Sequence, residues 1–205
     1  VHRALGTMLF ELTIDSRPNS AEQHSMTIPV NRLDPTPQVL LVNPASTASA
    51  HKTFEPNIYP NLGLLTLATS LRSALRRRNV AARVLYYDGA LLGDAFIRTY
   101  IAQNADRLTL IGYSAYTLNY GACVSLARHA KSCNAGIVNV IGNDHFSALY
   151  HEIITRQRDV FDYCFCGNDV VEGFSEFVLD QLTGRRAALD SYPGIVFRDP
   201  GSPSG

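Results

Sequence analysis

The strongest constraint on the fold is an alternation of short apolar runs with longer segments whose apolar residues recur at helical spacing. The first run, residues 39–42, is continuously apolar, which is typical of a strand buried on both faces of a parallel sheet. A helix is predicted over 62–78, where apolar residues recur every three or four positions: Leu62, Leu65, Ala68, Leu71 and Leu75.

The same cycle repeats to the end of the chain. Further strands are predicted over 83–88, 108–114, 137–141, 162–166 and 194–198. Further helices are predicted over 90–104, 119–133, 147–157 and 170–183. Strands that alternate with helices imply right-handed crossovers and a covered parallel sheet. The sequence therefore predicts an α/β fold: a Rossmann-like, doubly wound, mostly parallel sheet of five to six strands with helices on both faces.

A chain of 205 residues suits one domain with a substantial core. The segment 1–37 is polar and contains proline without a sustained period, so we expect a flexible N-terminal extension. Residues 38–199 form the predicted Rossmann-like domain, and 200–205 a short tail.

Charge and composition exclude several classes of partner. The 18 basic and 18 acidic residues cancel, whereas binding to nucleic acid or an anionic membrane surface needs a positive excess. No apolar run approaches the roughly 20 residues that span a bilayer. The four cysteines form no C-x-x-C pair and are interpreted as structural thiols of a reducing compartment, so we expect a cytoplasmic protein.

Polar and small residues follow the predicted strands. In an open α/β sheet, ligands bind beyond the carboxyl ends of the strands. The residues there are Asn43-Pro44, Ser114 to Asn119, Gly142-Asn143-Asp144-His145 and Gly167-Asn168-Asp169. Each segment alone is more typical of a turn or helix cap, but together at one edge they predict a ligand site.

Common enzyme signatures are missing from the sequence. It has no G-x-G-x-x-G dinucleotide fingerprint, no G-x-x-x-x-G-K-[ST] phosphate loop and no G-x-S-x-G nucleophile elbow. Asp144 beside His145 leaves a small enzyme, acting on a nucleotide or with a metal, as an alternative hypothesis.

Five segments in register carry a family resemblance. They are the run 39–44 with 59–68, then 113–119, 142–148, 162–167 and 193–198. Together they resemble the N-terminal cobalamin-binding domain of cobalamin-dependent radical S-adenosylmethionine enzymes, over about residues 38–199.

The resemblance implies that the ligand is cobalamin, a corrinoid cofactor. Its contacts would include the residues that match the family's turns, with further residues at the same strand ends: Ser114, Thr117, Gly142 and Gly167, then Asn43, Pro44, Asn143, His145 and Asn168. The better-known cobalamin carriers have Asp-x-His-x-x-Gly after the first strand, whereas this chain has Asn-Pro-Ala-Ser there. We therefore expect a cobalt without a protein histidine ligand of that type.

The sequence also departs from the family. Asn143 replaces the second glycine of a Gly-Gly-x-His turn, and Asn168-Asp169 follows Gly167 where the family has glutamate. No C-x-x-x-C-x-x-C occurs, so this chain is expected to hold no iron–sulfur cluster and to lack the complete radical chemistry.

Two hypotheses follow from these departures. In the first, the domain holds the cofactor for a radical S-adenosylmethionine catalytic domain, in the same chain or in a partner protein. In the second, it is a degenerate domain that serves as an interaction or regulatory scaffold.

Overall fold

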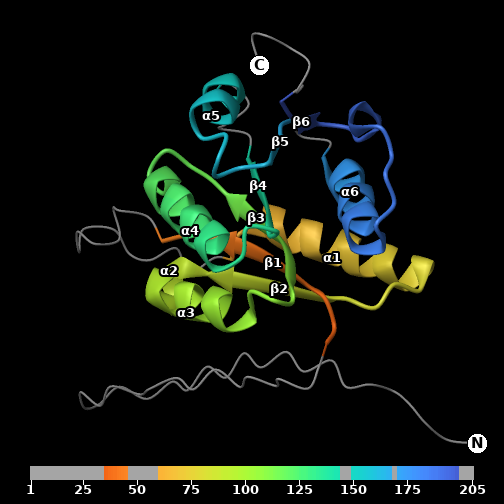
Figure 1. The fold of residues 1–205 in the computed structure, drawn as a ribbon, viewed down its shortest axis with the longest axis horizontal. Helices are drawn as coiled ribbons and strands as arrows, with labels where there is room; N and C mark the ends of the chain where they lie inside the picture. The colour runs from red at the N-terminus through yellow and green to blue at the C-terminus, as the bar shows by residue number, and fades with distance from the viewer. Residues whose placement is uncertain (1–34, 46–59, 144–148, 168–169, 199–205) are drawn as a thin grey trace, which may run out of the picture.

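The computed structural model describes residues 35–45, 60–143, 149–167 and 170–198 (Figure 1). The expectations for an N-terminal extension and for a tail rest mainly on residues outside these ranges. Among the predicted site residues, His145 and Asn168 also lie outside them, as does Asp144.

Within the described residues, one six-stranded sheet forms the centre of the molecule. Its strands are β1 (Gln38–Asn43), β2 (Arg83–Asp88), β3 (Leu108–Ser114), β4 (Val138–Gly142), β5 (Tyr163–Phe165) and β6 (Ile195–Val196). They lie in the order β2-β1-β3-β4-β5-β6, with the first five parallel and β6 antiparallel to β5. The predicted mostly parallel α/β sheet is confirmed.

The helices follow the predicted cycle with one difference. They are α1 (Leu62–Arg78), α2 (Gly89–Leu92), α3 (Asp94–Asn104), α4 (Tyr120–Cys133), α5 (Tyr150–Arg156) and α6 (Val171–Thr183), with a 3₁₀ turn η3 (Leu189–Ser191) before β6. The single helix predicted over 90–104 is wrong. The chain breaks at Gly93, whose φ of 76° a right-handed helix does not accept.

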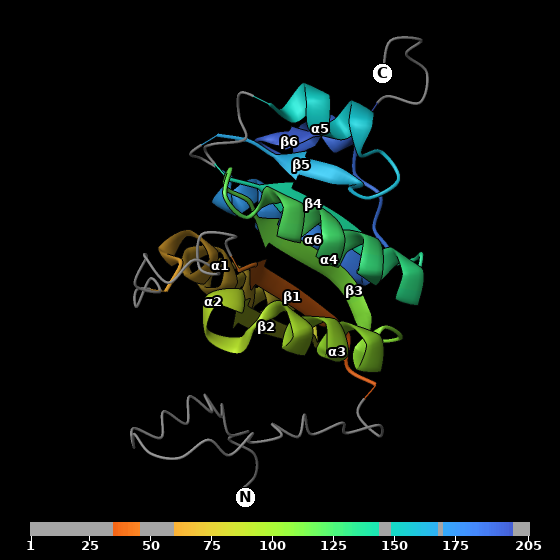
Figure 2. The ribbon, with the colours of Figure 1, turned by 90° about the vertical axis from the view of Figure 1, so that its left-hand side faces the viewer.

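Helices cover both faces of the sheet, as Figure 2 shows, with α3, α4 and α5 on one face and α1 and α6 on the other. Strand β1 serves both layers because successive side chains of a strand point to opposite faces. Leu40 and Val42 pack toward α3 and α4, while Val39 and Leu41 pack toward α1 and α6. All four are fully buried, which accounts for the continuous apolar run in the sequence.

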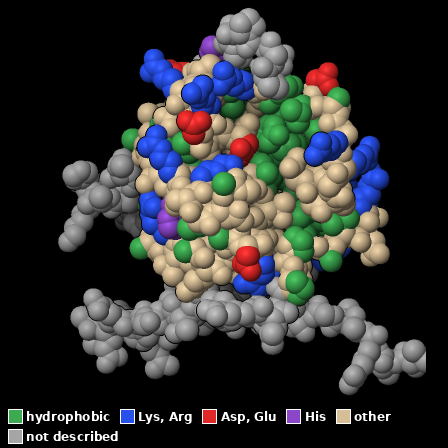
Figure 3. Space-filling view, viewed as in Figure 1, with side chains coloured by type: hydrophobic (Ala, Val, Ile, Leu, Met, Phe, Trp, Pro, Cys, Tyr) green, Lys and Arg blue, Asp and Glu red, His purple; other side chains and the backbone are tan. Residues whose placement is uncertain are grey.

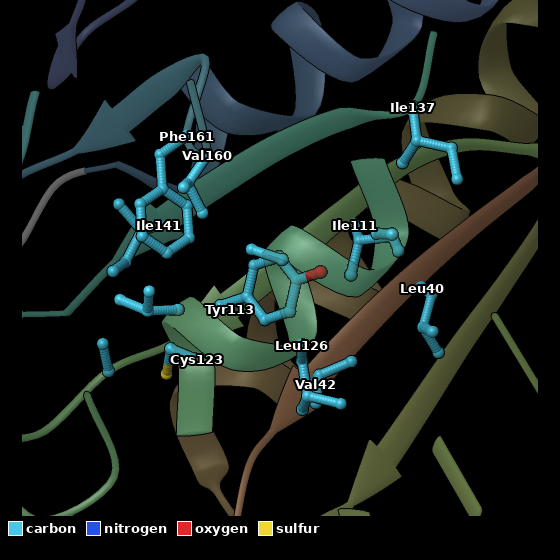
Figure 4. Packing of buried hydrophobic residues seen from close by; sticks show 14 of the residues in the cluster. Leu40, Val42, Ile111, Tyr113, Cys123, Leu126, Ile137, Ile141, Val160 and Phe161 are labelled. Carbon is cyan, nitrogen blue, oxygen red and sulfur yellow. The ribbon is translucent and has the colours of Figure 1, made fainter. Parts of the chain in front are cut away.

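The core on the α3–α5 face is filled by large side chains around Tyr113 (Figure 4). The ring of Tyr113 meets that of Phe161 edge to face, with centroids 5.9 Å apart. Burial raises the pKa of Tyr113 well above its ordinary value, so the phenol stays neutral. This face of the sheet is therefore covered by a packed hydrophobic core.

No helix within the described ranges is both long and apolar enough to cross a bilayer. On the face shown in Figure 3, the Lys and Arg side chains lie dispersed around the molecule and are not gathered in one stripe.

Candidate ligand-binding site

The strand order places a topological switch point between β1 and β3. From β1 the chain leaves through α1 on one face of the sheet, whereas from β3 it leaves through α4 on the other face. The loops after β1 and β3 therefore diverge, which leaves a crevice at the carboxyl edge where α/β proteins commonly bind ligands.

A cavity of about 530 Å³ opens beside this switch point, between the first turns of α1 and α6. Its walls come from strand ends, from the loops that follow them and from the two helices: Leu41, Gly112, Tyr113, Ser114, Tyr116, Val140, Gly142, Asn143, Phe165, Gly167, Asn61, Gly63, Leu64, Thr66, Leu67, Val170, Val171 and Phe174. A cavity of this size is in the range that binds small molecules or part of a larger cofactor.

Small residues on neighbouring strands create the space. Gly112 and Ser114 of β3 and Gly142 of β4 occupy positions that face α1 and α6, and Ser114 pairs with Gly142 in the sheet. A Cβ at position 112 would lie 2.9 Å from Leu41 Cδ2, and one at 142 would lie 3.0 Å from the Phe165 carbonyl oxygen. The floor of the cavity is therefore shaped for residues without side chains.

The inner walls are apolar and partly aromatic. Phe165 of β5 and Phe174 of α6 meet edge to face at 5.5 Å between ring centroids, with the rings 83° apart. Leu64 of α1 lines the opposite side and is itself buried. Such walls favour the planar, apolar part of a ligand.

A buried polar group lines the cavity at Ser114. Its hydroxyl oxygen accepts hydrogen bonds from Asn61 Nδ2 at 3.0 Å and from Asn143 Nδ2 at 3.2 Å. With both lone pairs engaged, the hydroxyl hydrogen is left to donate. The site therefore suits a ligand with an acceptor atom placed against Ser114.

Asn61 connects this polar group to the start of α1. Its Oδ1 accepts from the backbone N–H of Leu64 at 3.1 Å and so caps the helix, while Nδ2 also donates to Tyr116 Oη at 3.2 Å. The backbone N–H of Asn61 donates to Tyr86 Oη at 3.2 Å. Asn61 is thus hydrogen-bonded to α1, to the end of β3 and to β2 at the cavity.

A second polar cluster lies at the ends of β1 and β2. Asp88 Oδ2 accepts from Tyr86 Oη at 2.9 Å and from Asn43 Nδ2 at 3.2 Å, and Oδ1 accepts from the N–H of Ala90 at 2.9 Å. Burial raises the pKa of Tyr86 to about 12, and the neighbouring Asp88 carboxylate acts in the same direction. Tyr86 therefore remains a neutral donor at ordinary pH.

Asn119 fixes the loop after β3 against the loop after β1. Its Oδ1 accepts from the backbone N–H of Tyr116 at 2.6 Å. Its Nδ2 donates to the carbonyl oxygens of Ser114 at 3.2 Å and Pro44 at 3.3 Å. These hydrogen bonds hold the loop after β3 against the loop after β1 at the switch point.

Large exposed apolar side chains surround this edge. Within the described residues they lie in the loops and at the helix starts that come between a strand end and the following helix: Leu62, Leu91, Tyr116, Leu118, Leu149 and Tyr150. Exposed apolar groups gathered at one edge of a domain mark an interaction surface. The cavity therefore opens within an apolar rim.

The structure brings most of the predicted site residues to this edge. Ser114, Gly142, Asn143 and Gly167 line the cavity. Asn43 belongs to the Asp88 cluster, and the carbonyl of Pro44 is bound by Asn119. Thr117 is exposed on the loop after β3 and does not line the cavity.

Sequence reasoning missed several residues that form the site. Asn61 could have been recognised as a helix cap directly before the apolar period of α1. The aromatic residues Tyr116, Phe165 and Phe174 carry no such signal, because each resembles an ordinary core or loop residue until the tertiary fold places it. Among the described residues, no three His, Cys, Asp or Glu side chains come together as metal ligands.

Comparison with solved structures identifies the fold. The chain is similar to the cobalamin-dependent S-adenosylmethionine radical enzyme OxsB with aqua-cobalamin bound, with a TM-score of 0.58 and 19% identity over 80% of this chain. The selenomethionine-labelled apo form of OxsB gives a TM-score of 0.55, also at 19% identity and 80% coverage. Each match spans 21% of the OxsB chain. No protein-family model and no curated protein matches the sequence.

Proposed function

We propose that this domain binds cobalamin at the carboxyl edge of its sheet and holds it for a radical S-adenosylmethionine catalytic domain. One observation carries the proposal: the cavity of about 530 Å³ lies at the switch point of a fold shared with part of a cobalamin-dependent radical enzyme. The catalytic partner is inferred from the same similarity, since this chain matches only 21% of that enzyme.

The residues at the edge fit the chemical parts of cobalamin. The corrin ring is broad, flat and fringed with amides, so it requires an open apolar surface with hydrogen-bonding groups. The rim residues Leu118 and Tyr116 offer such a surface. The nucleotide tail ends in a flat heterocycle, which the narrower cavity between Leu64 and Phe174 can accept. The donor at Ser114 then faces a ligand acceptor.

The residues at the end of β1 bear on whether the protein would supply a ligand to the cobalt. Asn43 and Pro44 stand where a cobalt-ligating motif would place its first residues, and Asn43 is engaged with Asp88. When bound, the cobalt would supply a centre that accepts and releases a methyl group. This chain would contribute binding and orientation of the cofactor, with the apolar rim excluding water from the corrin face that rests on it.

Spectral titration tests the proposal. The purified chain should change the visible spectrum of hydroxocobalamin and co-elute with it on gel filtration. Aquacobinamide, which lacks the nucleotide tail, should bind at least about tenfold more weakly, because it leaves the cavity empty. Absence of a spectral change and of co-elution with hydroxocobalamin would contradict cobalamin binding. Equal affinity for the two corrinoids would contradict the assignment of the tail to the cavity.

A second candidate function, that of a degenerate scaffold, is favoured by Asn143. Its side chain lines the cavity and occupies one acceptor position of Ser114. If the scaffold hypothesis is correct, the natural chain fails to bind hydroxocobalamin and Asn143→Gly gains binding. Equal binding by both proteins counts against it.

A further inference from the structure

Two cysteines lie side by side at the end of β5. Cys164 and Cys166 are two positions apart along an extended chain, so their side chains emerge on the same face of the sheet. Their sulfur atoms are 3.4 Å apart. Cys164 is fully buried in the core of the α3–α5 face, whereas Cys166 is half-buried at its edge.

We propose that Cys164 and Cys166 form a redox-active dithiol, which closes into a disulfide by exchange with a small-molecule disulfide and thereby reshapes the wall of the cavity. The disulfide exchange is independent of the proposed cofactor. Only its effect on ligand affinity rests on the proposed function.

The environment assigns different roles to the two thiols. The hydrogen bond between the two thiols lowers the pKa of Cys166. The same hydrogen bond, together with burial, raises the pKa of Cys164. Since the thiolate is the nucleophile in disulfide exchange, the accessible Cys166 attacks first.

The exchange proceeds in two balanced steps. The Cys166 thiolate attacks one sulfur of glutathione disulfide, which forms a mixed disulfide at Cys166 and releases one glutathione thiolate. Cys164 then attacks the Cys166 sulfur, and its proton passes to the second glutathione as that thiolate leaves. The protein loses two hydrogen atoms and the glutathione disulfide is reduced to two thiols.

Closure is expected to deform the end of β5. Residues two apart on a strand have Cα atoms roughly 6.4–6.8 Å apart, at the upper end of the separation that a disulfide spans, with its most common value about 5.5–6 Å. Closure at the most common separation shortens the chain around Phe165, which lies between the two cysteines.

Phe165 connects this deformation to the cavity. Its side chain points to the opposite face of the sheet, where it lines the cavity against Phe174. Gly167, the residue after Cys166, lines the cavity as well and has a φ of 99°. The backbone N–H of Cys166 donates to the Gly194 carbonyl oxygen at 2.8 Å, the bond most directly strained by closure. Figure 2 shows β5 between β4 and β6, so a shortened β5 affects both neighbours.

The other two cysteines supply the controls. Cys123 is fully buried, and burial raises the pKa of its thiol far above the ordinary value. Cys133 is half-buried beside His129, with its sulfur 3.6 Å from Nε2. A Cys133→Ser background removes this second partly accessible thiol, so that exchange reports on the β5 pair.

Mass spectrometry after incubation with glutathione disulfide tests the chemistry. The Cys133→Ser protein should lose two hydrogen atoms and retain no glutathione. The disulfide should be found within the single peptide that contains positions 164 and 166. Adding Cys164→Ser should trap one glutathione on Cys166. Adding Cys166→Ser should leave Cys164 unmodified in the folded protein. Failure to form the internal disulfide, or equal glutathione capture by both single variants, would overturn the dithiol assignment.

Hydrogen exchange tests the effect on the wall. In the oxidised Cys133→Ser protein, the amide of Cys166 should exchange at least about tenfold faster than in the reduced protein. The amide of Ile111 in the middle of β3 should be unchanged. An internal disulfide without faster exchange at 163–167 would overturn the reshaping of the wall.

Ligand binding supplies a separate readout. If hydroxocobalamin binds the reduced protein, its affinity should fall severalfold on oxidation. If the reduced protein does not bind it, the cofactor proposal fails, while the mass and exchange results still decide the dithiol proposal.

Discussion

The amide of Asn143 donates a hydrogen bond to the Ser114 hydroxyl at 3.2 Å, from a backbone whose φ is 147°. This dihedral favours glycine, so the residue combines backbone strain with a favourable side-chain contact. The same residue lines the cavity, so a substitution at position 143 is expected to change both the stability of the fold and the binding of a ligand there.

Two substitutions separate strain from hydrogen bonding at this position. Asn143→Ala and Asn143→Gly both remove the amide, but alanine keeps a Cβ at the unfavourable φ. We expect Asn143→Gly to be more stable than Asn143→Ala by about 1 kcal/mol. Urea denaturation of the two variants measures the difference in the free energy of unfolding, and an alanine variant as stable as the glycine variant would disprove the strain.

The floor of the cavity can be tested with a second pair of substitutions. Gly112→Ala places a Cβ against Leu41 Cδ2, which must move, so we expect a loss of about 1 kcal/mol of stability. Gly121→Ala, on the exposed face of α4, meets nothing within 4 Å and should gain about 0.5–1 kcal/mol from its higher helix propensity. Thermal or urea unfolding compares the two, and a stabilising Gly112→Ala would show that the floor is not tightly packed.

Tyr86 leads to a pH-dependent prediction. An unfolded tyrosine titrates near pH 10, roughly, whereas the pKa of Tyr86 in the folded protein is about 12. Between these values the unfolded state loses the proton and the folded state keeps it. The contribution of Tyr86 to stability is therefore complete below about pH 10 and lost as the pH rises toward 12.

Tyr86→Phe removes this contribution, so its free energy of unfolding should fall less steeply than that of the natural protein above about pH 10. Urea unfolding at about pH 9 and about pH 11 measures both slopes. Parallel slopes would mean that Tyr86 titrates alike in the folded and unfolded states.

Much of the fold could be predicted because local patterns determine it. The helix 62–78 and the strands 83–88 and 108–114 have the predicted bounds, since continuous apolar runs and a clear helical period leave little ambiguity. The break at Gly93 was missed because a glycine within a helical pattern is often tolerated. The antiparallel direction of β6 has no local signal at all, because a two-residue strand pairs according to where the preceding turn delivers it.

The candidate site was predictable only in part, for a physical reason. Ser114 and Gly142 are the last residues of β3 and β4, and the sheet topology alone brings strand ends together. The cavity itself depends on how α1 and α6 are spaced over β3, which brings Asn61 and Phe174 into the lining of one cavity. That spacing is a property of tertiary packing, and neither residue differs locally from a cap or a core aromatic.

The most direct test of the central claim uses a matched pair of residues on α1. Thr66 and Thr69 are both exposed, and each hydroxyl donates to the carbonyl oxygen four residues earlier, at 2.9 and 2.8 Å. Thr66 lines the cavity and Thr69 does not. In equilibrium dialysis against hydroxocobalamin, we expect Thr66→Trp to lose at least about tenfold in affinity by filling the cavity, while Thr69→Trp stays within about twofold of the natural chain. Equal affinities for the two variants, or no retention of hydroxocobalamin by the natural chain, would contradict the assignment of a cobalamin site to this cavity.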